Sequence, residues 1–434
     1  MKYTHSFSRH VKARDFLDCA HILGSYRARL QKIAKTERYL LPESSLGLPA
    51  DTTILRSVRR MVRATVSSKL RSIIVIGIGG SNLGAKAVYD ALREYDDVLA
   101  PDRFPKLFFV DTLHDAWIAR IKVLVSQTAD CAEILIVIIS KSGTTTETVA
   151  AADVLLYALR RAKGFLKRIV AITDRESPLW KKALQHEWHT LEMPAMVGGR
   201  FSIFSSAGLF PLAAAGLNIV ALRRGACAMR RACFGGFVKK NPALYSAAQL
   251  FLHYRHGYIV HDTFIFSPPL ESLGRWYRQL LAESIGKEFD QNGKKVNCGI
   301  IPTVSVGSTD LHSVAQLYLG GPKKIITTFI RIASRTSVRV PAYGNLYGLV
   351  KGIESQSLSM IMDALLDGTQ IAYAKAHLPF GECVLKKISE EELGAFFQWK
   401  MMEVMYLGRL LNINAFDQPN VESYKAESRK RLGA

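Results

Sequence analysis

The chain has 434 residues, of which 48% are hydrophobic and 22% charged, a composition typical of a globular protein with more than one core. The formal net charge of +21 admits a nucleic-acid partner, but the basic residues are spread along the chain without a nucleic-acid-binding motif, so we expect none. A basic surface could equally attract a small phosphorylated substrate. The apolar runs are too short to cross a bilayer, the first residues lack the apolar core of a secretion signal, and the six cysteines are scattered, so we expect a cytoplasmic protein.

Strand and helix patterns alternate through most of the chain. Residues 1–60 are predicted to form a helical N-terminal segment that packs on the second domain. Short apolar strands separated by helices follow in two series, which predicts two α/β domains with parallel sheets, 61–195 and 196–345. A helical segment, 346–434, completes the chain, and the methionines of its long apolar helix are expected in the core. The predicted strands lie within residues 71–80, 105–112, 132–140, 167–174, 257–267, 296–307 and 323–332.

A glycine-rich stretch, "GIGGSNLG" (77–84), follows the first predicted strand. It is not a dinucleotide fingerprint, because Asn82 stands where that frame needs its last glycine, and it lacks the Gly-Lys-Ser/Thr of a Walker loop. Two interpretations are left. The stretch is a tight strand-to-helix turn, or it delivers Gly80 and Ser81 to a polar ligand at a helix N-terminus.

A hydroxyl-rich stretch, "SKSGTTTET" (140–148), follows the third predicted strand and precedes a helix. Helix capping would use one of its six hydroxyl groups. Backbone amides, the helix dipole, the hydroxyls and Lys141 could together bind a phosphate monoester, and we favour that interpretation. A third stretch, "GGRFSIFSSAG" (198–208), places Arg200 on a tight approach to another helix, either as a surface arginine or as part of an anion site.

Candidate acid–base residues occur later in the chain. Gln279 and Glu283 are four residues apart, on one face of a helix that we expect to end shortly after Glu283. His312 follows a predicted strand, and Gln418 and Lys425 lie near the C-terminal end. Each of these residues, taken alone, is better explained by a structural or solvated role. The stretch "HEWH" (186–189) lacks the spacing of a zinc motif, so no metal site is predicted.

Taken together, the motifs resemble those of the glucose-6-phosphate isomerase (phosphoglucose isomerase) family, over about residues 72–430. The matching segments are "GIGGSNLG", "SKSGTTTET", "GGRFSIFSSAGL", "QLLAESIGK", "STDLHSVAQ" and "FDQPNVESYK", in the order of the family. The resemblance implies two doubly wound parallel-sheet domains of the sugar-isomerase (SIS) type with a helical C-terminal segment that completes the active site. It also implies interconversion of glucose 6-phosphate and fructose 6-phosphate, a reaction of glycolysis and gluconeogenesis.

The resemblance further implies the role of each residue. Glu283 would be the base that moves a proton between carbons 2 and 1, and Arg200 would stabilise the cis-enediolate. His312, from the partner subunit of a homodimer, and Lys425 would assist ring opening. No cofactor and no metal are implied, because no electrons move and no group leaves. The implied substrate-binding residues are Gly80, Ser81, Ser140, Lys141, Ser142, Thr145, Gln279 and Gln418.

The chain departs from the family pattern at three positions, none of which carries a catalytic charge. Ile285 stands where asparagine is common, Ser142 where threonine is frequent in longer members, and Asn420 where glycine is usual. Two other functions compete with the isomerase. A sugar-phosphate-sensing regulator would need the phosphate loops without the full acid–base set, and a nucleic-acid binder would need none of the loops.

Overall fold

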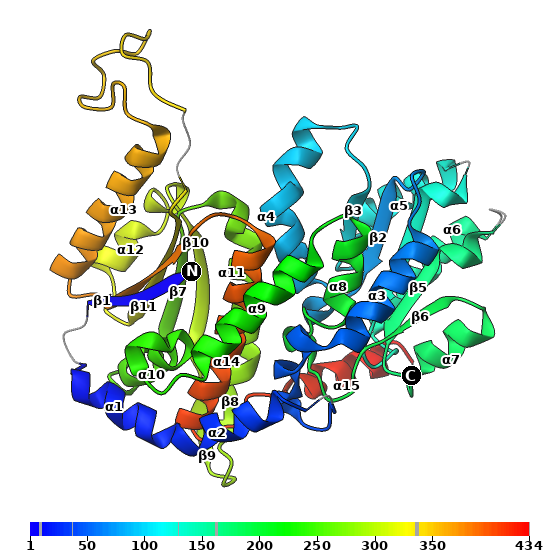
Figure 1. Ribbon diagram of the computed structural model, residues 1–434, viewed down its shortest axis with the longest axis horizontal. Helices are drawn as coiled ribbons and strands as arrows, with labels where there is room; N and C mark the ends of the chain where they lie inside the picture. The colour runs from blue at the N-terminus through cyan, green and yellow to red at the C-terminus, as the bar shows by residue number, and fades with distance from the viewer. Residues whose placement is uncertain (8–10, 37, 129, 161–163, 335–337, 434) are drawn as a thin grey trace.

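The structure is a computed structural model that describes residues 1–7, 11–36, 38–128, 130–160, 164–334 and 338–433. Within these residues the chain forms two five-stranded sheets and one two-stranded hairpin. Figure 1 shows the two sheets in separate halves of the molecule, with helices α4, α8, α9 and α11 between them. In the described part of the chain, no helix combines the length and the apolar character needed to span a membrane.

The helices cover the sheets and fill the space between the two halves. The longest, α14, is buried over almost its whole length, and the predicted core positions of Met401, Met402 and Met405 are confirmed. The helices of the described residues are α1 (Ala13–Ile22), α2 (Gly24–Ile33), α3 (Thr52–Thr65), α4 (Leu83–Leu99), α5 (Asp115–Gln127), α6 (Thr146–Leu159), α7 (Pro178–Gln185), α8 (Ser206–Ala214), α9 (Ile219–Cys233), α10 (Pro242–Arg255), α11 (Glu271–Ile285), α12 (Ala315–Gly320), α13 (Leu358–Lys375), α14 (Glu390–Leu410) and α15 (Val421–Arg431).

The first sheet is wholly parallel and has the strand order β3-β2-β4-β5-β6. The sequences of β2 and β4, "SIIVI" and "ILIVII", are buried at every position, as expected for strands covered by helices on both faces. Four strands of this sheet are confirmed where they were predicted, whereas β6 was not predicted. The strands are β2 (Ser72–Ile76), β3 (Lys106–Val110), β4 (Ile134–Ile139), β5 (Ile169–Thr173) and β6 (His189–Glu192).

The second sheet has the order β1-β12-β11-β7-β10 and is parallel except for β1, which pairs antiparallel with β12. The predicted parallel α/β architecture is therefore confirmed for both halves, and the three strands predicted for this half are confirmed. The strands are β1 (Lys2–Phe7), β7 (Val260–Ile265), β10 (Ile301–Val306), β11 (Ile325–Ile332) and β12 (Phe380–Leu385); the hairpin is β8 (Lys287–Phe289) with β9 (Lys295–Cys298).

Two outer strands of this sheet correct the sequence analysis. The expectation that residues 1–60 are helical is wrong for Lys2–Phe7, and the expectation that residues 346–434 are helical is wrong for Phe380–Leu385. Both segments are short and carry polar residues, and β1 forms by pairing with the edge of β12, more than 370 residues away. Such long-range pairing leaves no local periodicity from which these strands could be predicted.

Candidate active site

Arg200 lies in the turn Gly199–Phe201 that precedes α8, and its side chain is 1% exposed. Its guanidinium reaches the last turns of α11, where Nε donates to Ser284 Oγ at 2.9 Å and Nη1 pairs with Glu283 Oε2 at 3.2 Å. Nη1 also donates to Gln418 Oε1, and Nη2 donates to the backbone oxygen of Ala415 at 2.8 Å. The buried arginine thus joins three segments that are far apart in the sequence.

Glycines let the loops of the site come this close. A Cβ on Gly80 would lie 2.2 Å from the carbonyl carbon of Gly199 and 2.4 Å from the nitrogen of Arg200, so another residue could not occupy this position unless the backbone moved. Gly79 has a φ of +56°, and a Cβ there would lie 2.8 Å from Gln279 Nε2. The "GIGG" stretch is therefore more than a strand-to-helix turn, because it packs against both the arginine loop and α11.

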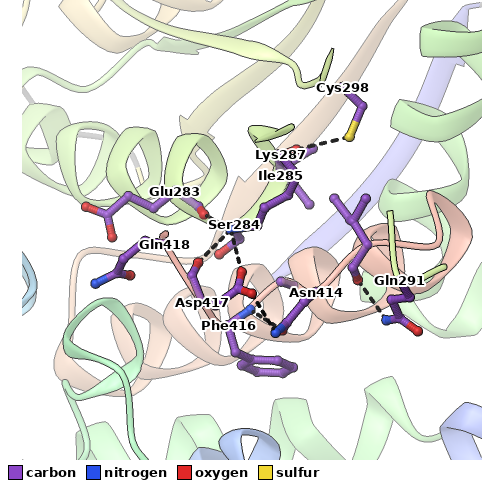
Figure 2. Close-up of polar contacts among 12 residues, drawn as sticks. Glu283, Ser284, Ile285, Lys287, Gln291, Cys298, Asn414, Phe416, Asp417 and Gln418 are labelled. Carbon is purple, nitrogen blue, oxygen red and sulfur yellow. Dashed lines mark hydrogen bonds and ion pairs between the residues drawn. The ribbon is translucent and has the colours of Figure 1, made fainter. Parts of the chain in front are cut away.

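Glu283 lies in the last turn of α11, and both of its carboxylate oxygens have hydrogen-bond partners. Oε1 accepts from Gln279 Nε2 at 2.8 Å, and Oε2 pairs with Arg200. The side chain nevertheless remains 33% exposed, so the carboxylate is oriented and accessible at the same time. Figure 2 shows it beside Gln418, which lies in the loop after α14. An oriented, accessible carboxylate next to a fixed cation suits proton abstraction from a substrate that develops negative charge.

The charge of Arg200 is held in a region of low polarity. Burial lowers the pKa of Arg200, and the Glu283 carboxylate opposes that shift by favouring the charged guanidinium. Since an arginine remains protonated over the working pH range, the site keeps a permanent positive charge with its donors fixed in direction.

The hydroxyl-rich loop lies between β4 and α6. Ser140 Oγ and Thr145 Oγ1 are 2.9 Å apart, and the backbone nitrogen of Gly143 donates to Ser140 Oγ at 3.1 Å. Thr145 is the N-cap residue of α6, yet its side chain makes no capping hydrogen bond. The backbone amides in the first turn of α6 are therefore not capped by the Thr145 side chain, and free amides at a helix N-terminus are groups that can bind an anion. Ser142 lies in the same loop, where its Oγ accepts from the backbone nitrogen of Thr144 at 3.3 Å.

Lys141 links this loop to the arginine. Its Nζ donates to the backbone oxygen of Ala195 at 2.7 Å, on the segment that leads to Arg200. Burial lowers the pKa of Lys141, Asp174 opposes that shift, and the charge of Arg200 adds to it. Moreover, β2 and β4 are neighbours in a parallel sheet, so the loops containing Gly80, Ser81 and Ser140 leave the same edge of that sheet.

The structure does not bring His312 or Lys425 into contact with Glu283 or Arg200. His312 is exposed in the turn after β10, where its backbone nitrogen donates to Thr309. Lys425 lies on α15, and its Nζ pairs with Glu422 at 2.6 Å. Arg200, Glu283, Gln279 and Gln418 contact one another within one subunit, whereas His312 and Lys425 lie outside that cluster.

The sequence analysis missed contacts around the end of α11. Ser284 holds the Nε of Arg200, and Lys287 binds backbone oxygens of Glu283 and Asp417. Both residues belong to the "ESIGK" segment, which carried the signal, but no role had been assigned to them. Within the described residues, no group of three or more His, Cys, Asp or Glu side chains is arranged to hold a metal ion.

Comparison with known proteins shows the family of the chain. A family model described as phosphoglucose isomerase matches residues 55–430. A glucose-6-phosphate isomerase of Streptococcus pyogenes serotype M3 is 33% identical over 382 residues, covering 85% of this chain and 82% of that protein. A probable glucose-6-phosphate isomerase of Methanococcus maripaludis is 31% identical, with 82% and 77% of the two chains covered.

Two solved structures extend the comparison. A hypothetical protein of Thermus thermophilus superposes over the whole of both chains with a TM-score of 0.85 and 30% identity. A glucose-6-phosphate isomerase of Chlamydia trachomatis superposes over 99% of this chain and 88% of its own with a TM-score of 0.81, and at 21% identity it shows the shared fold. The chain belongs to the phosphoglucose isomerase family.

Proposed function

We propose that this chain interconverts glucose 6-phosphate and fructose 6-phosphate by moving one proton between carbons 2 and 1 through a cis-enediolate. The observation that carries the proposal is the carboxylate of Glu283, with one oxygen held by Gln279 at 2.8 Å and the other by Arg200 at 3.2 Å. Family membership supports the substrate class, because the relatives are named for glucose 6-phosphate.

In this mechanism Glu283 takes the proton from the carbon next to the carbonyl and returns it to the neighbouring carbon. Arg200 stabilises the negative oxygen of the enediolate with a charge and donors that are already in place before reaction. The phosphate is bound by the loop after β4, with Ser140, Ser142, Thr145 and Lys141 as donors. Gly80, Ser81, Gln279 and Gln418 line the sugar, and the reaction needs no cofactor.

Ring opening requires one group that donates a proton to a sugar oxygen and another that removes one. We assign this step to Lys425 and to the His312 of a second subunit, in a homodimer that acts in the cytoplasm. The exposed position of His312 supports an origin across an interface. The arm of residues 338–357, which Figure 1 shows projecting beyond α13, presents Tyr343 at 85% exposure and Leu349 at 76% exposure, and it suits contact with another subunit.

The test is the rate of glucose 6-phosphate formation from fructose 6-phosphate, measured in quenched samples without added metal or nucleotide. We expect turnover by the wild type and a loss of about a hundredfold or more in kcat for Glu283→Gln. Glu271→Gln is a matched control, because Glu271 is a half-exposed residue at the start of the same helix that pairs with Arg275 at 2.6 Å. A wild type that binds fructose 6-phosphate without turnover would overturn the proposal in favour of a sugar-phosphate-sensing protein.

A further inference from the structure

Lys287 is a buried lysine with every donor position in use. It is the first residue of β8, immediately beyond α11, and its side chain is 5% exposed. Nζ donates to the backbone oxygen of Glu283 at 2.8 Å and to the backbone oxygen of Asp417 at 2.6 Å, and it lies 3.2 Å from Asp417 Oδ1. Figure 2 shows Lys287 between the end of α11 and the loop that carries Asp417 and Gln418.

Burial of an ammonium group is unfavourable unless hydrogen bonds and opposite charge compensate for the lost hydration. Burial lowers the pKa of Lys287, while the charge and hydrogen bonds of Asp417 oppose the shift. An apolar residue could fill the same space, but it could not bind two backbone oxygens from different segments. The contacts therefore indicate that Lys287 fixes the position of one segment relative to the other.

The loop of residues 413–418 is packed unevenly, because Ile413 and Ala415 are buried whereas Asn414, Asp417 and Gln418 are exposed. A cavity of about 400 Å³ lies against Asn414, Ala415 and Phe416, and a second of about 130 Å³ lies against Asn414 and Asp417. Gln291 Nε2 holds the beginning of the loop at the oxygen of Ile413, at 3.0 Å. Because Asp417 and Gln418 are exposed, this end of the loop is held mainly by its polar contacts toward α11 and Arg200.

Two buried cations supply those contacts. Arg200 binds the backbone oxygen of Ala415 at 2.8 Å, and Lys287 binds that of Asp417 at 2.6 Å. Gln418 is the next residue in the chain, and its side chain accepts from Arg200 Nη1, the same nitrogen that pairs with Glu283. A shift of Asp417 would therefore move Gln418 and change the direction of the guanidinium toward the carboxylate.

We propose that Lys287 is a positioning residue that holds the loop of residues 413–418 against the end of α11 and so fixes the Arg200–Glu283–Gln418 geometry. The kinetic consequence rests on the proposed function, whereas the contacts by which Lys287 holds the loop, called the clamp below, are a property of the structure alone. Because the phosphate loop belongs to the other half of the molecule, we expect loss of Lys287 to lower kcat more than it raises KM, with any change in KM arising through the sugar-lining residue Gln418.

The experiment compares Lys287→Met with Lys295→Met, which removes an exposed lysine of the same hairpin that pairs with Glu288 at 3.0 Å. We expect Lys287→Met to lower kcat by about 10- to 100-fold, as for misplaced catalytic groups, with KM changed less than about threefold. Lys287→Arg, which keeps the charge and donors, should recover part of the loss. Lys295→Met should match the wild type.

Hydrogen–deuterium exchange of residues 413–420 supplies a readout that does not depend on activity. We expect faster exchange there in Lys287→Met than in the wild type or Lys295→Met. If Lys287→Met does not fold, Asp417→Asn removes the 3.2 Å ion pair while keeping the backbone acceptor, and it should give a smaller change in the same direction. An inactive wild type would refute the proposed function and leave the exchange result to judge the clamp. Unchanged exchange and kcat in a folded Lys287→Met would overturn the clamp.

Discussion

The two sheets share a parallel architecture but contribute to the site in different ways. In the first sheet β2, β4 and β5 are buried throughout, and the polar groups that reach the site come from loops beyond the strand ends. In the second sheet β7 buries His261, Asp262 and Thr263 in sequence, and the site receives α11, the helix that follows this strand. The proposed phosphate contacts therefore come from loops of the first half, and Glu283 comes from a helix of the second. Substitutions can change one set without changing the other.

Arg200 is where the two halves meet, so its removal should have the largest effect. We expect Arg200→Met to lower kcat by about 10³-fold, since a preorganised donor for a developing anion is lost together with its charge. Arg200→Lys keeps the charge without the forked donors and should lose less. Arg175→Met, an exposed arginine that pairs with Glu192 at 2.6 Å, is the control in the same steady-state assay. A fully active Arg200→Met would show that the halves do not need this connection.

Gly80 tests how tightly the first-sheet loop fits against the arginine loop. Gly80→Ala should reduce the free energy of unfolding by about 3 kcal/mol, because the new methyl group meets backbone atoms that cannot rotate away. Urea titrations measure the change. Gly368→Ala, in the interior of α13 with no atom within 4 Å of its added Cβ, should instead be neutral or stabilising by up to about 1 kcal/mol. Equal effects of the two substitutions would contradict the close fit.

The ionisation of Asp262 provides a test of the buried polar residues on β7 of the second sheet. Burial raises its pKa to about 6, opposed by hydrogen bonds that include those from Thr303 and Ser305, while the charge of Asp310 raises it further. The unfolded carboxyl titrates near pH 3.9. Between about pH 4 and pH 6 the native state therefore keeps a proton that the unfolded state has lost, so the stability from this group falls as the pH rises.

The measurement is the free energy of unfolding of the wild type and Asp262→Asn across this range. The wild-type value minus the variant value should fall by about 2 kcal/mol between pH 4 and pH 7. A difference that stays constant with pH would mean that Asp262 ionises as readily in the folded protein as in the unfolded chain.

The two sheets also differ in how many of their strands could be predicted from the sequence. The first-sheet strands are continuous runs of Ile, Val and Leu, so four of the five could be located from the sequence, while β6, "HTLE", has too little apolar character. In the second sheet β1 and β12 were missed because both are short and form by pairing with strands far away in the sequence, β1 with β12 and β12 also with β11. The fold class was accessible, whereas the edges of the sheets were not.

In the site, residues whose side chains suit acid–base chemistry could be predicted from the sequence, whereas the residues that hold them in position could not. Arg200, Glu283, Gln279 and Gln418 were predicted, and the structure brings them into contact. Lys287 was missed because its partners are backbone oxygens, which every residue possesses. The roles of His312 and Lys425 remain predictions, because neither side chain contacts Glu283 or Arg200 within one subunit.

Ser140 tests the phosphate loop and should give the smallest effect. Its Oγ accepts from the backbone nitrogen of Gly143 and lies 2.9 Å from Thr145 Oγ1, so Ser140→Ala removes one hydroxyl and leaves the helix amides in place. One hydrogen bond to a charged group contributes about 1.5 kcal/mol, which corresponds to a rise in KM of roughly tenfold with kcat nearly unchanged. Ser126→Ala, an exposed serine of α5 whose Oγ donates to the oxygen of Val123, is the control for the same assay. A fall in kcat without a rise in KM would place Ser140 with the acid–base half of the site rather than with the phosphate.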